Sequence, residues 1–386
     1  MISSPVVVVG LGAMGSAACA HLARRGVPVI GIDRFSPPHD QGSSHGGSRV
    51  ARRAYFEHPD YVPLLERAFR GWERLESETG LACLKRVGVL LMGGPDSEVL
   101  RASQESAKRH SIEVMALAPR QLATAYPQFG LPDGTCGLLE PDAGFVIPEN
   151  GVEAHLRVAR RHGAEFRLDT RVVAIEADDD GGVVRLEGES IDASRIVVTA
   201  GAWSNQLLPG IAERLHLAAQ RKHIVWFRPR DATLCSDARM PAWVIDDGGA
   251  CGDGLYYGVP TWSGQIGHDG VKIGFHGPGT PIDPDDHART PDPLVVDRFR
   301  NDMERYLPGV LGDPVAAATC LYTMSPDQHF VIDLVPDARS VAFAAGFSGH
   351  GYKFAPVIGE LLADLVLEGS SELPADFLRV GRFTES

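Results

Sequence analysis

The segment Gly10-Leu11-Gly12-Ala13-Met14-Gly15 follows directly on the apolar run Pro5–Val9, and it constrains the fold of this chain most strongly. A second apolar run, Val27–Ile32, ends at Asp33, so the pattern predicts a strand, a glycine turn, a helix, a strand and an acid. Glycines in such a turn let the backbone approach a pyrophosphate, and the helix N-terminus offers free N–H groups. The pattern therefore predicts that this segment binds a dinucleotide and that Asp33 binds the hydroxyl groups of a ribose. The alternative is a glycine turn with a purely structural role. The residues expected to contact the dinucleotide here are Gly10, Gly12, Met14, Gly15 and Asp33.

Length and charge narrow the class of protein. A chain of 386 residues with 44% hydrophobic content is long enough for two packed cores. The formal net charge of -13 argues against a nucleic-acid or anionic-membrane partner, because either would require a basic face. No segment approaches the length of a membrane span, and Met1–Pro5 lacks the features of a signal peptide, so we expect a cytoplasmic protein. The six cysteines lack C-x-x-C spacing, which indicates neither a zinc site nor a disulfide framework.

The order of the predicted elements indicates an α/β fold with two interleaved domains. Strands and helices alternate near both ends of the chain, whereas residues 220–323 read mainly as short strands interrupted by one helix. We expect a Rossmann-like nucleotide domain with a parallel sheet and a substrate domain with a mainly antiparallel sheet. The expected nucleotide domain comprises residues 1–80, 150–215 and 320–386, and the expected substrate domain comprises residues 81–149 and 216–319.

Two further segments are candidates for close contact with a ligand. The run Phe35–Ser48 is rich in residues that favour turns, and it is long enough to suggest a functional loop. The apolar run Arg195–Val198 leads into Thr199-Ala200-Gly201-Ala202-Trp203, a second place where backbone can approach a cofactor.

Two later tracts carry a resemblance to a known family. They are Cys320-Leu321-Tyr322-Thr323 leading into Pro326–Asp333, and the glycine-rich run Gly346–Phe354. Together with Pro37-Pro38-His39, Ser44-His45-Gly46 and Arg49, they resemble the monomeric sarcosine oxidase and N-methyltryptophan oxidase family of flavoenzymes over nearly the whole chain.

The resemblance implies FAD rather than NAD, with a covalent bond between a flavin methyl carbon and the sulfur of Cys320. Such a bond is chemically sensible where nearby cations favour the thiolate, and a buried apolar cysteine at a strand end is the alternative. In Gly346–Lys353 the glycines would bring backbone N–H groups to the flavin, and the helix beginning near Tyr352 would offer its positive end. Beyond the first glycine turn, the implied cofactor-binding residues are Ser44, His45, Ser48, Val173, Gly201, Trp203, Cys320, Gly349, His350, Gly351 and Lys353.

The same resemblance implies a site for an amino acid. Arg52 and Lys353 match the residues that hold the substrate carboxylate, and an arginine fork suits a carboxylate well. Tyr322 would cover the entrance of the pocket. The residues assigned to catalysis are Arg49 beside the flavin ring, Tyr257 and His276 lining the pocket, and Lys272.

Lys272 is a charged residue inside the apolar run Val271–Phe275, and strand alternation places Lys272, Gly274 and His276 on one face. The resemblance implies that this lysine activates O2, because a fixed cation stabilises the negative charge that develops on oxygen. An edge-strand lysine that discourages aggregation is the alternative.

These assignments predict a monomeric oxidase of secondary amino acids, N-methyl or cyclic, that converts O2 to H2O2. A flavin dehydrogenase passing electrons to a carrier and a non-catalytic flavoprotein subunit are the alternatives, whereas an NAD-dependent dehydrogenase leaves Cys320 without a role. Three features depart from the family pattern: Gly47 replaces a common aspartate, Arg53 replaces a common histidine, and the segment from Tyr257 to Lys272 is longer.

Overall fold

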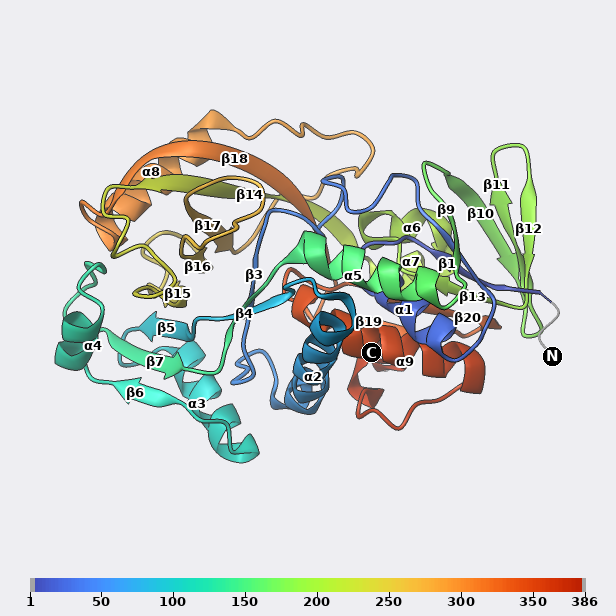
Figure 1. Cartoon of the computed structure of the whole chain (residues 1–386), viewed down its shortest axis with the longest axis horizontal. Helices are drawn as coiled ribbons and strands as arrows, with labels where there is room; N and C mark the ends of the chain where they lie inside the picture. The colour runs from blue at the N-terminus through green and yellow to red at the C-terminus, as the bar shows by residue number, and fades with distance from the viewer. Residues whose placement is uncertain (1–3, 384–386) are drawn as a thin grey trace.

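The computed structural model describes residues 4–383 and contains two large sheets. The outermost residues of the expected segments 1–80 and 320–386, and the start of Met1–Pro5, lie outside the described residues. Figure 1 shows the two sheets side by side, joined by segments from early, middle and late parts of the chain. The expected α/β fold, with one mainly parallel and one mainly antiparallel sheet, is confirmed.

The first sheet has six strands in the order β19-β20-β13-β1-β2-β9. Its neighbouring strands are parallel except β19 and β20, which are antiparallel. Its central strands are buried apolar runs, as a parallel sheet covered on both faces requires. The strands are β1 Val6–Val9, β2 Val29–Ile32, β9 Glu165–Arg167, β13 Arg195–Val198, β19 Val331–Val335 and β20 Ala338–Ala345.

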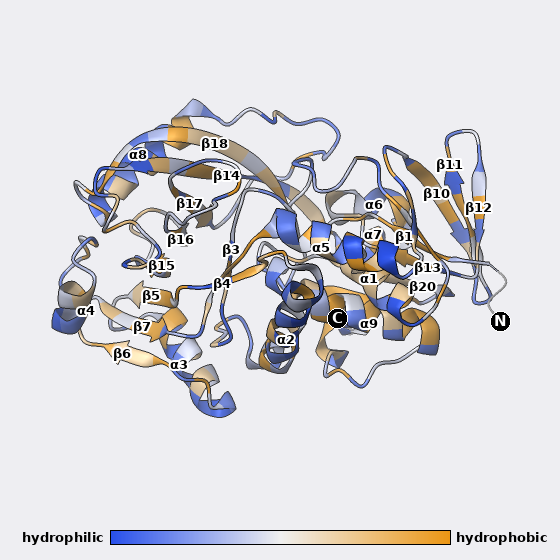
Figure 2. Ribbon diagram, in the orientation of Figure 1, coloured by the Kyte–Doolittle hydropathy of each residue, from blue (hydrophilic) through white to orange (hydrophobic). Residues whose placement is uncertain are grey.

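Helices cover one face of this sheet, and a small three-stranded sheet with two short helices covers the other. Helix α1 follows the glycine turn and packs closely on α9, where a Cβ on Gly359 would lie 2.5 Å from the Ala17 backbone. Hydrophobic residues gather in the strands of the sheet, and hydrophilic ones on the outer faces of α2 and α5 (Figure 2). The elements of these layers are α1 Ala13–Arg24, α2 Val62–Thr79, α5 Pro148–Arg161, α9 Ala355–Glu368, β10 Val172–Ala177, β11 Gly182–Leu186, β12 Ser190–Ala193, α6 Ser204–Leu207 and α7 Pro209–Leu215.

The second sheet has eight strands in the order β18-β14-β17-β16-β15-β5-β7-β6. All of its pairs are antiparallel except β15 with β5, and one face packs on helices α4 and α8. Its other face therefore remains for the segments that lie between the two sheets. The elements are β5 Val89–Gly93, β6 Met115–Leu117, α4 Pro119–Ala125, β7 Cys136–Glu140, β14 Ala218–Pro229, β15 Ala242–Asp246, β16 Leu255–Val259, β17 Val271–His276, α8 Pro293–Tyr306 and β18 Leu311–Met324.

The prediction of mainly short strands over residues 220–323 was wrong at two places. Strands β14 and β18 have 12 and 14 residues and pair along most of their length. Gly312 and Pro314 interrupt the pattern in the sequence, yet a proline is tolerated in β18 because this strand lies at the edge of the sheet. The predicted domain boundary at residue 320 therefore falls inside a continuous strand, and Cys320 lies within the eight-stranded sheet rather than at a strand end.

A small sheet of three strands, β3 Arg49–Ala51, β8 Gly144–Val146 and β4 Leu84–Arg86, connects the two large sheets. Helix α3, Glu98–His110, begins after Ser97, whose hydroxyl accepts a hydrogen bond from Leu100 N. Within residues 4–383, no helix combines the length and the apolar character that crossing a bilayer requires.

Candidate active site

Two adjoining cavities lie between the sheets. The larger has a volume of about 210 Å³ and extends from the glycine turn at Gly10 to the glycine-rich segment before α9. The smaller has a volume of about 90 Å³. Both are lined by Arg49, Tyr322, Gly349 and Tyr352, so one end of a ligand in the larger cavity would face a molecule in the smaller one.

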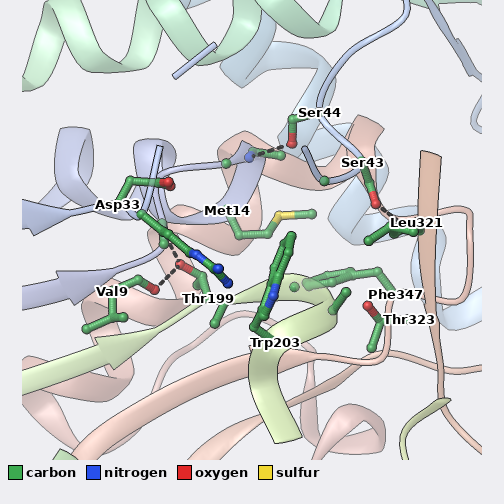
Figure 3. Close-up of a pocket in the computed structure, with 18 of the residues that line it drawn as sticks. Val9, Met14, Asp33, Ser43, Ser44, Thr199, Trp203, Leu321, Thr323 and Phe347 are labelled. Atoms are coloured by element: carbon green, nitrogen blue, oxygen red, sulfur yellow. Dashed lines mark hydrogen bonds between the residues drawn. The ribbon is translucent and has the colours of Figure 1, made fainter. Parts of the chain in front are cut away.

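The predicted dinucleotide residues form one end of the larger cavity. Gly10, Gly12, Met14 and Asp33 line it, and Figure 3 labels Met14 and Asp33. Asp33 Oδ2 accepts a hydrogen bond from Leu11 N at 2.6 Å. Gly10 has a φ of +90°, and a Cβ there would lie 2.5 Å from the Thr199 carbonyl oxygen. Only glycine therefore fits this turn without strain.

Gly15 has a different place from the other glycines of the motif. It does not line the cavity, and a Cβ on Gly15 would lie 1.7 Å from the Gly10 carbonyl oxygen. Its role in this structure is to let α1 approach the turn, which is the packing role of the third glycine in such motifs.

Two other segments complete this end. Ser44 Oγ accepts a hydrogen bond from Ala13 N at 3.0 Å, and Trp203 lies across the cavity from it (Figure 3). Gly201 also lines the cavity. The side chain of Val173 does not line it: Val173 is 47% exposed, and the neighbouring Val172 faces the cavity instead.

His39 also lines the larger cavity, although we did not assign it to the cofactor site. Its Nε2 lies 3.4 Å from Asp33 Oδ1. Position 39 lies in the turn-rich loop after Asp33, and this loop was the signal that could have identified it.

The far end of the larger cavity is formed by the glycine-rich segment. Gly349 has a φ of +83°, and a Cβ there would lie 2.1 Å from the ring of Tyr322. Gly351 lines the same cavity, and the 3-10 turn Tyr352–Phe354 then leads into α9. The N-terminal end of this helical segment therefore lies at the cavity, where its dipole favours negative charge.

Lys272 lines neither cavity and is buried to 1% exposure on β17. Strand β17 lies between β14 and β16, so the alternative of an edge-strand lysine is excluded. Its Nζ donates to the Ser48 carbonyl oxygen at 2.5 Å, and Arg49 Nη1 donates to the same oxygen at 2.8 Å. Burial lowers the pKa of Lys272 well below its usual range, and Arg49 lowers it further, whereas Cys320 and Glu149 oppose this shift.

Cys320 is 3% exposed and lines neither cavity, although Leu321 and Tyr322 beside it do. Burial raises the pKa of its thiol, and the cations Arg49, Lys272 and Lys222 act in the opposite direction. The expected cations are therefore present, but desolvation outweighs them. Lys222, directly opposite Cys320 in the sheet, was not predicted, although a lysine inside the strand run before Ile224–Phe227 is the same kind of signal as Lys272.

The smaller cavity is lined by Arg52 and Lys353, predicted to bind the substrate carboxylate, and by Tyr257 and His276, predicted to be catalytic residues of the same pocket. Lys353 Nζ donates to the His350 carbonyl oxygen at 2.6 Å. His350, assigned from the sequence to the cofactor, lines this smaller cavity instead of the larger one, as does Lys353. Apolar side chains supply the remaining wall: Val50, Phe56, Val244 and Leu255.

Glu57 is the site residue that sequence reasoning missed. Its Oε2 accepts a hydrogen bond from Arg52 Nη2 at 2.7 Å. Although burial raises the pKa of Glu57, Arg52, His350 and Lys353 together lower it to about 2. One carboxylate thus faces two cationic side chains, which leaves the cavity suited to one more negative group.

Of the remaining titratable groups, His276 is neutral near pH 7 and Lys353 titrates there. Burial lowers the pKa of His276 to about 4, with Lys222, Lys353 and Arg52 adding to this effect against Glu57. Burial and Arg52 lower the pKa of Lys353 to about 7, again against Glu57. The charge of the cavity therefore depends on pH through Lys353.

Two of the three departures from the family pattern are in contact. Gly47 has a φ of +74°, and a Cβ there would lie 2.5 Å from the Ile266 carbonyl oxygen. Ile266 belongs to the longer segment between Tyr257 and Lys272, so this segment occupies the space that a side chain at position 47 would need. Arg53, the third departure, pairs with Glu140 at 3.2 Å and lines neither cavity.

Two residues assigned to the cofactor, His45 and Ser48, line neither cavity, although the adjacent Ser44 and Arg49 line the larger one. Within the described part of the chain, His45 Nε2 and Ser48 Oγ are buried without a hydrogen-bond partner. A dinucleotide-shaped cavity lined by glycines, with an adjoining pocket for an anion, defines a dinucleotide-dependent oxidoreductase.

The chain belongs to the DAO family of FAD dependent oxidoreductases, whose sequence profile matches residues 5–365. It is 37% identical over 370 residues to the monomeric sarcosine oxidase of Bacillus sp. (strain NS-129), covering 95% of this chain and 94% of that protein. It is 33% identical over 382 residues to the N-methyl-L-tryptophan oxidase of Salmonella enteritidis PT4 (strain P125109), covering 98% and 99%. The solved structure of NikD, an amino acid oxidase essential for nikkomycin biosynthesis, superposes with a TM-score of 0.85 at 25% identity over 98% of both chains. The predicted family and FAD dependence are thereby confirmed.

Proposed function

We propose that this protein is an oxidase of secondary amino acids, N-methyl or cyclic, that transfers electrons to O2 and acts as a monomer. The observation that supports the proposal is the wall that the two cavities share, because the smaller cavity, with Arg52 and Lys353, adjoins the larger one there. The names of the relatives, a sarcosine oxidase and an N-methyl-L-tryptophan oxidase, support the same substrate class.

The substrate carboxylate binds between Arg52 and Lys353. Arg52 is already oriented by Glu57 and stacks over Phe56, with its Cζ 4.0 Å from the ring centroid. Charge-assisted hydrogen bonds of this kind contribute ~1.5 to 3 kcal/mol each when shielded from water. The apolar wall of Val244 and Leu255 receives the uncharged part of the substrate.

The amine reacts in its neutral form. The positive charge of Arg52 and Lys353 lowers the pKa of a bound amine, so no strong general base is required. Neutral His276 and Tyr257 line the cavity and orient the amine.

The residues of the larger cavity would hold FAD, and Arg49 and Tyr322 lie where this cavity adjoins the smaller one. When bound, FAD supplies the redox chemistry: it takes a hydride equivalent from the carbon next to nitrogen and passes two electrons to O2. The resulting imine is hydrolysed by water to an amine and a carbonyl compound. Lys272 and Arg49 provide fixed positive charge where negative charge develops on oxygen.

Cys320 would supply the sulfur of the covalent bond to a flavin methyl carbon. In the overall reaction one methyl C–H bond and the thiol S–H bond break, the C–S bond forms, and O2 accepts the two electrons and two protons as H2O2. Arg49, Lys272 and Lys222 surround the Cys320 sulfur and favour the thiolate against the cost of burial. Attachment requires the cofactor methyl group to reach the wall formed by Leu321 and Tyr322, next to the cysteine in β18.

An anaerobic substrate panel tests the proposed reaction. The purified yellow protein is mixed without O2 with sarcosine, N-methyl derivatives of larger amino acids, and cyclic imino acids, and the flavin absorbance is followed. We expect at least one of these compounds to bleach the flavin, and N-acetyl amino acids, which lack a basic amine, to leave it unchanged. If no secondary amino acid bleaches the flavin, the proposed substrate class is wrong.

A further inference from the structure

Glu149 is in the first helical turn of α5. Its side chain contacts the tight turn that the loop residues Gly46, Gly47 and Ser48 form. Its Oε1 accepts hydrogen bonds from Gly46 N at 2.7 Å and from Gly47 N at 3.1 Å. Its Oε2 is buried and has no hydrogen-bond partner among residues 4–383. A buried carboxylate oxygen without a partner is costly, so its negative charge needs an explanation.

We propose that Glu149 is the counter-charge that keeps Lys272 protonated, and thereby reactive toward O2, once Cys320 has been consumed in the bond to the flavin. This inference rests on the proposed function.

Hydrogen bonds through the turn Gly46–Ser48 link Glu149 to Lys272. Ser48 N donates to the Gly46 carbonyl oxygen at 2.9 Å, and the Ser48 carbonyl oxygen accepts from Lys272 Nζ at 2.5 Å. Glu149 therefore fixes the backbone that orients the lysine. It is a positioning residue, because it lines neither cavity.

The groups that shift the pKa of Lys272 come from three elements. Arg49 on β3 disfavours its protonated form, whereas Cys320 on β18 and Glu149 on α5 favour it. His45 from the long loop is also close, but burial, with Arg49 and Lys272, lowers its pKa to about 3, so it is neutral. Trp226 on β14 presents its ring to Nζ at 5.9 Å and carries no net charge.

Bond formation at Cys320 changes this balance. A thioether sulfur carries no charge and cannot ionise, so the contribution of Cys320 to Lys272 is lost. Glu149 then remains as the anion opposing burial and Arg49. Without it, Lys272 would lose its proton at a lower pH.

The proton on Lys272 matters for the reaction with O2. Transfer of two electrons and one proton from reduced FAD to O2, with one further proton from solvent, gives oxidised FAD and H2O2. A cation beside the reacting oxygen stabilises the negative charge that appears with the first electron. The rate of this step therefore falls as pH rises through the pKa of Lys272.

The variant Glu149→Gln separates charge from geometry, because its amide oxygen can still accept from Gly46 N and Gly47 N. Substrate-reduced enzyme is mixed with O2 between pH 6 and 10 in a stopped-flow instrument. We expect the midpoint pH of the fall in reoxidation rate to be lower in Glu149→Gln than in wild type by about one pH unit or more. At a pH between the two midpoints, the variant should therefore be reoxidised about tenfold more slowly. Anaerobic reduction by substrate should stay within about twofold of wild type.

Two variants serve as controls. Glu149→Asp keeps the negative charge on a shorter side chain. Its reoxidation rate should therefore fall at the same pH as in wild type, even if the rate is lower at every pH. Glu153→Gln removes a charge from the same helix where it pairs with Arg157 at the surface, at 2.6 Å, and should behave as wild type. A pH-independent loss in Glu149→Gln, or an unchanged profile, would overturn the proposal.

A second readout does not depend on turnover. The absorption spectrum of the bound oxidised flavin is titrated with pH, because ionisation of a nearby lysine shifts it. The midpoint should be lower in Glu149→Gln than in wild type, and the transition should be absent in Lys272→Met. If the wild-type protein does not react with O2, the proposed function is wrong, but this titration still tests whether Glu149 keeps Lys272 protonated. Equal midpoints in wild type and Glu149→Gln would refute that role of Glu149 without bearing on the proposed function.

Discussion

Arg49 and Lys272 donate hydrogen bonds to one acceptor, the Ser48 carbonyl oxygen, at 2.8 and 2.5 Å. Arg49, which lines both cavities, and the fully buried Lys272 are thus held side by side on a single turn. Like charges at this distance repel, so the arrangement persists only where backbone oxygens and anions compensate it. It provides fixed positive charge at the place where a flavin would face its second substrate.

Replacing Arg52 tests the carboxylate site. Arg52→Gln removes the guanidinium fork and leaves Glu57 without its partner at 2.7 Å. We expect KM for the best amino-acid substrate to rise roughly 10- to 100-fold, because one charge-assisted pair is lost. Steady-state kinetics measures this, with Arg52→Lys as an intermediate that keeps charge without the fork. A lowered kcat at unchanged KM would assign Arg52 to another step.

The pKa of Lys353 predicts how anion binding depends on pH. Because this pKa is about 7, the side chain is a cation below pH 7 and neutral above it. The dissociation constant of a simple carboxylate such as propionate, measured by flavin absorbance, should therefore rise above pH 7, by at most about tenfold per pH unit. Lys353→Met should bind more weakly and lose this pH dependence. A flat profile in wild type would contradict the assignment.

Acid precipitation tests the bond at Cys320. The wild-type pellet should stay yellow, whereas the Cys320→Ser pellet should be white because its FAD is released. Cys251→Ser alters a partly exposed cysteine in the turn between β15 and β16 and should retain the colour. A colourless wild-type pellet would show that FAD is bound without a covalent link.

The sequence predicts best what local patterns determine. The turn from Gly10 to Asp33 follows from glycine spacing and two apolar runs, and the apolar spacing of 61–76 predicts α2, whose Leu64, Phe69 and Trp72 are buried. Strand alternation also places Lys272 and His276 on one face, and Lys272 is indeed buried on the inner side.

Features that depend on contacts between distant segments could not be predicted in this way. Strand β18 is rich in alanine and contains Pro314, so only its pairing with β14 makes it a strand. Glu57 stands in a polar stretch without periodicity, and its importance arises because folding surrounds it with Arg52, His350 and Lys353. The residue pattern of the sequence therefore indicates neither the length of β18 nor the importance of Glu57.

Gly47 offers a test of the contact between the two departures from the family pattern. Gly47→Ala should destabilise the protein more than Gly264→Ala, although both positions have positive φ, +74° and +80°. A Cβ at 264 meets no atom within 4 Å, so that variant carries only the backbone strain of about 1 to 2 kcal/mol. The overlap with Ile266 should add roughly 1 to 3 kcal/mol at position 47. Urea unfolding of both variants measures the difference, and equal losses would argue against the contact.

A single-turnover experiment tests the central claim most directly. The protein is bleached anaerobically with one equivalent of the best secondary amino acid and then mixed with O2, while flavin colour and H2O2 are followed. We expect complete reoxidation with one H2O2 formed per flavin, and Lys272→Met to reduce normally but reoxidise at least roughly tenfold more slowly. Bleached protein that stays reduced in O2 and recovers its colour only with an artificial electron carrier would identify a dehydrogenase and contradict the assignment as an oxidase.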